Sequence, residues 1–119
     1  MGAKVVHFEI LGSDADGLHK FYGDLFDWEI QNIPEMGYGL VQPQGDGSIG
    51  GGIGKAQDGS PGHVTFYIEV DDVQAYLDKA ESMGGKTVMP VTEIPNMVTF
   101  ALFADPQGGV IGLVKSQES

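Results

Sequence analysis

Apolar and polar residues alternate near the start of the chain, at residues 4–11, which is the pattern of a half-buried strand. A stripe with helical spacing follows it, formed by Leu18, Phe21, Tyr22 and Leu25. Ser13 or Asp14 can cap this helix. Turns rich in Gly and Pro then separate three further predicted strands, at residues 28–33, 37–41 and 48–54. The first half therefore predicts the order strand, helix, strand, strand, strand.

The second half predicts the same order of elements. It contains a strand pattern at residues 63–70 and a helix capped by Asp71 or Asp72 that ends at Gly84-Gly85. The apolar face of this helix consists of Val73, Tyr76, Leu77, Ala80 and Met83. Three more strand patterns follow, at residues 86–91, 97–104 and 109–115. We expect one α+β domain over residues 1–119, with module one at about 1–56, module two at about 60–119 and a connector at 55–62.

A short motif occurs once in each half and supports this duplication. Pro43-Gln44-Gly45 precedes Ile49-Gly50, and Pro106-Gln107-Gly108 precedes Ile111-Gly112. Repetition at about half the chain length indicates two copies of one βαβββ unit. Because each copy predicts a twisted sheet, we expect curved mixed sheets that enclose a cleft for a ligand.

Charge narrows the classes of partner. The chain has 17 acidic residues and 6 basic ones, a net charge of −11, and all the basic residues are Lys. Nucleic acids and anionic membranes are therefore poor partners, and bidentate clamping of a phosphate by Arg is impossible. A neutral or cationic ligand fits better. The chain contains no Cys and no apolar run long enough to span a bilayer, and we expect a cytoplasmic location.

Several motifs together resemble those of one known family. They are His7 on the first strand, Phe21-Tyr22, Val70-Asp71-Asp72, Met83-Gly84-Gly85, and Ala104-Asp105-Pro106-Gln107-Gly108. In this arrangement the chain resembles the vicinal oxygen chelate superfamily of glyoxalases, bleomycin-resistance proteins, fosfomycin-resistance enzymes and extradiol dioxygenases. The resemblance implies the fold described above and a homodimer, which is also the commonest assembly of small soluble domains. The same fold supports many chemistries, so the resemblance does not fix the activity.

The resemblance also implies where a catalytic metal would bind, because enzymes of this family place a His on the first strand and a Glu on the last strand of each half. These positions correspond to His7 and Gly50 in the first half, and to Thr65 and Gly112 in the second, with His63 two residues before Thr65. Glycine has no side chain to coordinate a metal, and a catalytic site needs about three protein ligands. We therefore expect no metal cofactor. A rearranged divalent site of His7 and His63 with Glu9 or Glu69 is the alternative.

Strand alternation predicts which side chains share the cleft. If His7 faces inward, Glu9 does so too, and the matching strand contributes His63, Thr65, Tyr67 and Glu69. Glycines at 50–52 and 112 would leave room for a ligand against the backbone. Apolar walls, or alternatively core packing, could come from Trp28, Tyr38, Met97 and Phe100. His19 is expected on the solvated side of the first helix.

These observations lead to two functions of different classes. The first is binding of a small neutral or cationic organic molecule in a metal-free acidic cleft, as the bleomycin-resistance branch is understood to do. The second is a metal-free isomerase or lyase in which Glu9 or Glu69 acts as the base and His7 as its partner. A metal-dependent glyoxalase-type or dioxygenase-type enzyme with a rearranged site is a third possibility.

Overall fold

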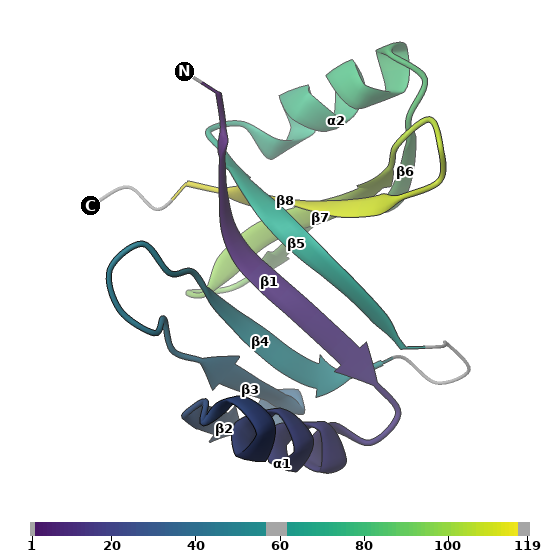
Figure 1. Ribbon diagram of the computed structural model, residues 1–119. Coiled ribbons are helices and arrows are strands. Elements are labelled where there is room, and N and C mark those ends of the chain that lie inside the picture. The colour runs from purple at the N-terminus through teal and green to yellow at the C-terminus, as the bar shows by residue number, and fades with distance from the viewer. Residues whose placement is uncertain (1, 57–61, 117–119) are drawn as a thin grey trace. The chain divides into compact units, whose positions relative to one another are not determined.

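The computed structural model describes residues 2–56 and 62–116, which fall into two compact units (Figure 1). One unit comprises His7–Thr65, and the other comprises residues 66–119 together with residues 1–6. The expected α+β class and the two βαβββ modules are confirmed. Most of the connector expected at residues 55–62 lies outside the described residues.

The first unit contains a four-stranded sheet with α1 (Ala15–Phe26) on one face (Figure 1). Its strands are β1 (Lys4–Gly12), β2 (Ile30–Ile33), β3 (Tyr38–Val41) and β4 (Gly50–Lys55), and a short 3-10 helix, η1 (Pro34–Met36), precedes β3. The strand order is β2-β3-β4-β1, in which β1 runs parallel to β4 and the other pairs are antiparallel. Residues on alternate positions of β1 therefore point to opposite faces of this sheet.

Helix α1 begins at an Asp cap and is held to the sheet by aromatic rings. The Asp14 carboxylate accepts a hydrogen bond from the Gly17 N–H at 3.0 Å. Tyr22 stacks on Trp28 with ring centroids 5.9 Å apart, and Trp28 lies 5.5 Å from Phe8 of β1. The predicted apolar stripe is only partly used, because Phe21 and Leu25 are 57% and 58% exposed and no residue of α1 is fully buried.

The second unit has the same order of elements around a buried apolar core. Its elements are β5 (His63–Val70), α2 (Val73–Ser82), β6 (Lys86–Ile94), β7 (Val98–Ala104) and β8 (Val110–Lys115), with strand order β5-β8-β7-β6. Residues 63–65 of β5 are counted with the first unit. Asp72 caps α2 by accepting from the Ala75 N–H at 3.1 Å. The buried core consists of Val70, Val73, Leu77, Ala101 and Leu113. Within the described residues, neither helix is long and apolar enough to cross a bilayer.

The two copies of the Pro-Gln-Gly motif form turns that precede β4 and β8. Gly45 and Gly108 both adopt positive φ, of 113° and 95°, a conformation that disfavours residues with a Cβ. In the second copy, the Asp105 carboxylate accepts from the N–H groups of Gln107 and Gly109. The duplicated motif thus specifies turn geometry.

Strand β6 lies at the edge of the second unit's sheet and is irregular. Its pairing with β7 shifts register between Thr87 and Met89 and again between Met89 and Thr92. Pro90 falls within the second shift, where its missing N–H removes a ladder hydrogen bond. The strand is also longer than the sequence pattern predicted, since it continues to Ile94.

The core of the second unit should be sensitive to loss of volume under α2. Leu77 is 2% exposed, and we expect Leu77→Ala to lower the free energy of unfolding by about 2–5 kcal/mol through lost burial and the cavity left behind. Met83 follows the same helix and is 68% exposed, so Met83→Ala should cost less than about 0.5 kcal/mol. Urea denaturation monitored by circular dichroism measures both values. Equal losses in the two variants would contradict this assignment of the core.

Candidate functional site

The candidate site begins with the parallel pairing of β1 and β4. In this register His7 lies opposite Gly50, and Glu9 lies opposite Gly52. Because His7 and Glu9 are two residues apart, both side chains leave the same face of the sheet. Phe8 points to the other face, towards α1, where its ring lies over Gly51.

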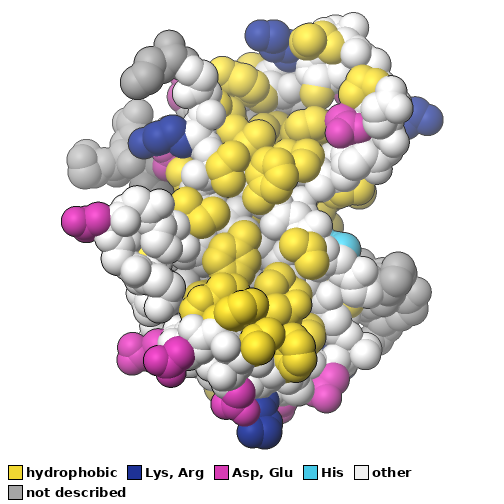
Figure 2. All heavy atoms as spheres, in the orientation of Figure 1, with side chains coloured by type: hydrophobic (Ala, Val, Ile, Leu, Met, Phe, Trp, Pro, Cys, Tyr) yellow, Lys and Arg dark blue, Asp and Glu magenta, His cyan; other side chains and the backbone are white. Residues whose placement is uncertain are grey.

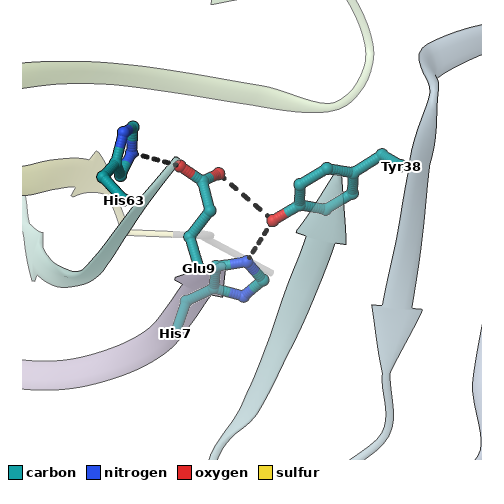
Figure 3. Close-up of polar contacts among 4 residues, drawn as sticks. All are labelled: His7, Glu9, Tyr38 and His63. Carbon is teal, nitrogen blue, oxygen red and sulfur yellow. Dashed lines mark hydrogen bonds and ion pairs between the residues drawn. The ribbon is translucent and has the colours of Figure 1, made fainter. Parts of the chain in front are cut away.

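Four polar side chains of the first unit converge on this face (Figure 3). We refer to them as the Glu9 cluster, which consists of His7, Glu9, Tyr38 and His63. The Tyr38 hydroxyl donates to Glu9 Oε2 at 3.2 Å and lies 3.0 Å from His7 Nε2. His63 Nε2 is 3.8 Å from Glu9 Oε1, so each carboxylate oxygen has a polar neighbour. The sequence predicted three of these residues as polar groups and gave Tyr38 only as a wall residue.

Burial affects the chemistry of the Glu9 cluster. The Glu9 side chain is 14% exposed and that of His63 is 41% exposed, so the carboxylate keeps limited contact with solvent. Burial lowers the pKa of His7, an effect that the nearby Glu9 charge partly opposes. The lowered pKa favours the neutral imidazole, which carries one N–H donor and one acceptor.

Tyr38 of β3 reaches the Glu9 cluster by extending over Gly52 of β4, which has no side chain to obstruct it. Tyr38 is paired with Gly54, and its ring extends over Gly52 of the same strand. A Cβ placed on Gly52 would overlap the Tyr38 hydroxyl and ring. We expected glycines here to leave room for a ligand, but the structure places an aromatic ring of the chain in that space.

The second unit repeats this arrangement at the equivalent position. Strand β8 matches β4 residue for residue, since both have six residues and end in Lys, at Lys115 and Lys55. The final pairs are Gly12 with Lys55 and Val70 with Lys115, and three residues earlier Glu9 pairs with Gly52 and Tyr67 with Gly112. A Cβ on Gly112 would overlap the Tyr67 ring. The counterpart of Gly112 is therefore Gly52, and the correspondence with Gly50 expected from the sequence was shifted by two residues.

The residues present do not fit the metal that the family resemblance implies. Positions 50, 52 and 112 are all glycine, so the last strand of neither unit offers a carboxylate there. In the part of the chain that the structure describes, no three His, Asp or Glu side chains are grouped so that they could hold a metal ion. In the Glu9 cluster, His7 and Glu9 both contact the phenol that lies between them. In a metal site both side chains would have to contact the ion directly. Absence of a metal cofactor remains a prediction.

The remaining candidate residues lie in different surroundings. Trp28 packs with Phe8 on the α1 side of β1, whereas His7 and Glu9 point to the opposite face. Of the two roles that the sequence allowed for Trp28, this contact fits packing and not a wall beside His7 and Glu9. Thr65 is 4% exposed. Phe100 meets Tyr67 edge-on within the second unit, at 6.3 Å between centroids.

Glu69 and Met97 belong to the second unit. Glu69 is 4.0 Å from Lys4 Nζ, a distance that makes a weak ion pair. Met97 lines an open hollow of about 530 Å³ whose charged residues are Asp71, Glu93 and Lys115. No pattern in the sequence pointed to this hollow.

His19 does not lie in solvent as the sequence suggested. Its Nε2 atom forms a 2.7 Å hydrogen bond with the Ile53 carbonyl, and its ring packs beside Gly39. Gly39 leaves the space for this ring between α1 and the sheet. The expectation was wrong because helical periodicity shows which residues are polar and cannot show that a neighbouring strand lacks a side chain.

Comparison with known proteins connects this geometry with one family. The sequence profile of the Glyoxalase/Bleomycin resistance protein/Dioxygenase superfamily matches residues 4–113. A glyoxylase-like domain-containing protein of Didymella fabae is 30% identical over 107 residues, which cover 84% of each chain. CFP32 of Mycobacterium tuberculosis is 35% identical over 75 residues, which are 63% of this chain and 29% of that protein. The match therefore spans less than a third of CFP32.

A solved structure shows the same fold. Methylmalonyl-CoA epimerase from Mycobacterium tuberculosis superposes with a TM-score of 0.64 at 17% identity, covering 96% of this chain and 88% of the epimerase. At this identity the likeness concerns the fold.

Proposed function

Because the chain belongs to the Glyoxalase/Bleomycin resistance protein/Dioxygenase superfamily, we propose that it binds a small neutral or cationic organic molecule with the Glu9 carboxylate as the anchor. The observation that carries this proposal is the geometry of Glu9. Its side chain is largely buried, its carboxylate accepts from the Tyr38 hydroxyl, and the exposed His63 side chain lies beside its other oxygen. Such a preorganised carboxylate is an acceptor for an N–H donor, and a cationic donor would gain charge assistance.

The charge of the chain favours the same class of ligand. The net charge of −11 attracts cations and repels anions, and the absence of Arg removes the usual bidentate partner of a carboxylate or phosphate ligand. A ligand N–H would approach Glu9 Oε1, where His63 lies 3.8 Å away and can turn aside without breaking a short hydrogen bond. Glu9 Oε2 would keep its bond from Tyr38.

A titration with charge-matched variants tests the anchor. A panel of cationic and planar compounds should contain at least one that binds more tightly than about 1 mM, measured by calorimetry or NMR. Glu9→Gln should weaken that compound at least about tenfold, because the charge-assisted hydrogen bond is lost. Glu35→Gln removes the same charge from an exposed position in η1 and should change affinity less than about twofold.

Two results would count against this function. One is that no compound of the panel binds more tightly than millimolar. The other is that Glu9→Gln and Glu35→Gln weaken binding equally, which would reduce the effect of Glu9 to overall charge.

A second function is supported by a specific observation, namely that one hydroxyl joins Glu9 to His7. This chain of hydrogen bonds suits a metal-free isomerase or lyase in which Glu9 takes a proton from carbon to leave an enolate. In isomerisation Glu9 then returns a proton to the carbon, and His7 acts as its partner by holding the Tyr38 hydroxyl that orients the carboxylate. Glu69, the other base considered from the sequence, instead faces Lys4 in the second unit. The epimerase with the same fold makes thioesters and ketones with an acidic C–H reasonable first probes.

Hydrogen–deuterium exchange tests this second function. In D₂O, the protein should catalyse loss of the acidic C–H signal of at least one probe, followed by NMR. Glu9→Gln should abolish the exchange, and Glu69→Gln should leave its rate within about twofold, because only Glu9 belongs to the hydrogen-bonded chain. An unchanged rate in Glu9→Gln would dismiss Glu9 as the base.

We also propose that the chain is a cytoplasmic homodimer. The absence of Cys supports the location, since extracellular domains of this size commonly rely on disulfides. The dimer is supported by three apolar side chains of α1 that remain exposed. They are Phe21, Leu25 and Phe26. Figure 2 shows that hydrophobic side chains gather on one face of the molecule.

Sedimentation velocity tests the dimer. The parent chain should sediment as a dimer, and Leu25→Lys should shift it to a monomer by placing a charge on the apolar face of α1. Met83→Lys adds the same charge at an exposed apolar position of the second unit and should leave the dimer intact. A monomeric parent chain would contradict the proposal.

A further inference from the structure

We propose that Tyr38 and Gly52 form one interlocked pair in which Tyr38 is the positioning residue of the Glu9 cluster. Its ring occupies the space that any side chain at residue 52 would need, and its hydroxyl sets the orientation of His7 and Glu9. The pair does not depend on which ligand the chain takes.

The first argument is steric. The three atoms nearest to a Cβ on Gly52 all belong to Tyr38, and all three lie far inside van der Waals contact. Gly50 on the same strand and face differs, because its nearest neighbours are the Val41 carbonyl at 3.0 Å and Pro43. A side chain at residue 52 is therefore incompatible with the position of Tyr38, whereas a small one at residue 50 requires only a slight adjustment.

The second argument concerns the proton of the Tyr38 hydroxyl. An ionised carboxylate can only accept, so Tyr38 uses its single proton on Glu9 Oε2. The hydroxyl then offers only a lone pair to His7, whose Nε2 must carry a proton to complete the 3.0 Å contact. Tyr38 thereby selects the Nε2–H tautomer of neutral His7 and leaves Nδ1 without the proton.

The third argument comes from the equivalent position of the second unit. Tyr67 lies over Gly112 as Tyr38 lies over Gly52, although Tyr67 belongs to the paired strand β5 and Tyr38 to β3. Two rings from different strands thus cover the same position of the last strand. A carboxylate at residue 52 or residue 112 would require removal of the ring first. Packing therefore keeps these two positions without the acidic metal ligand that the family resemblance implies.

A double-mutant cycle tests the steric part. Gly52→Ala should raise the unfolding equilibrium constant about 10- to 100-fold in the parent chain. In the Tyr38→Ala background the same substitution should raise it less than about threefold, because the obstructing ring is gone. Gly50→Ala is the matched control and should change the constant by the same factor in both backgrounds, within about twofold. Equal factors for Gly52→Ala in both backgrounds would overturn the interlock.

Nitrogen NMR tests the positioning part on variants that keep the ring. With ¹⁵N-labelled His at a pH where His7 is neutral, the parent chain should show the shifts of an Nε2–H tautomer. Tyr38→Phe removes only the hydroxyl and should change both ring-nitrogen shifts of His7, while Tyr22→Phe, which removes a hydroxyl from the aromatic packing of α1, should leave them unchanged. His7 shifts that are the same in Tyr38→Phe and the parent chain would overturn the assignment of Tyr38 as the positioning residue.

Discussion

The arrangement of the first unit depends on a strand that carries almost no side chains. Between Gly50 and Gly54, β4 has a single side chain, Ile53, so the rings of neighbouring strands can lie directly on its backbone. Phe8 does so from the α1 side, and Tyr38 does so from the side of His7 and Glu9. Close approach of rings to a bare backbone fixes the position of the Tyr38 hydroxyl, and through it the geometry of the Glu9 cluster.

Equivalent positions beside the last strand carry chemically different side chains in the two halves of the chain. The pair of Glu9 and Gly52 corresponds to Tyr67 and Gly112, and His7 corresponds to Thr65. Strand β1 therefore places ionisable groups at positions where β5 has a phenol and a hydroxyl. Duplication of the backbone preserved the turns and caps, because these depend on local residues such as Asp14, Asp72 and the positive-φ glycines. The side chains around the Glu9 cluster, in contrast, differ from their counterparts on β5.

Patterns of residues close in sequence were sufficient to predict the helices and strands, but not the contacts that side chains make between strands. The caps at Asp14 and Asp72, the glycines that end α2 and the order of strands follow from residues close in sequence, and the structure agrees. The role of Tyr38 could not be found in this way, because it depends on the register of β3 against β4 and on a ring that leans across two positions. His19 was misplaced for the same reason, since its ring fits a gap that Gly39 leaves in a neighbouring strand.

The irregular edge of the second sheet limits how copies of this chain can associate. An exposed edge strand is a template for a further strand, and β6 interrupts that template with two register shifts and with Pro90, which has no N–H to donate. In the first unit, the terminal strand β2 has only four residues and offers a short template. The edge of β6 therefore offers few consecutive N–H and C=O groups to a strand of another chain.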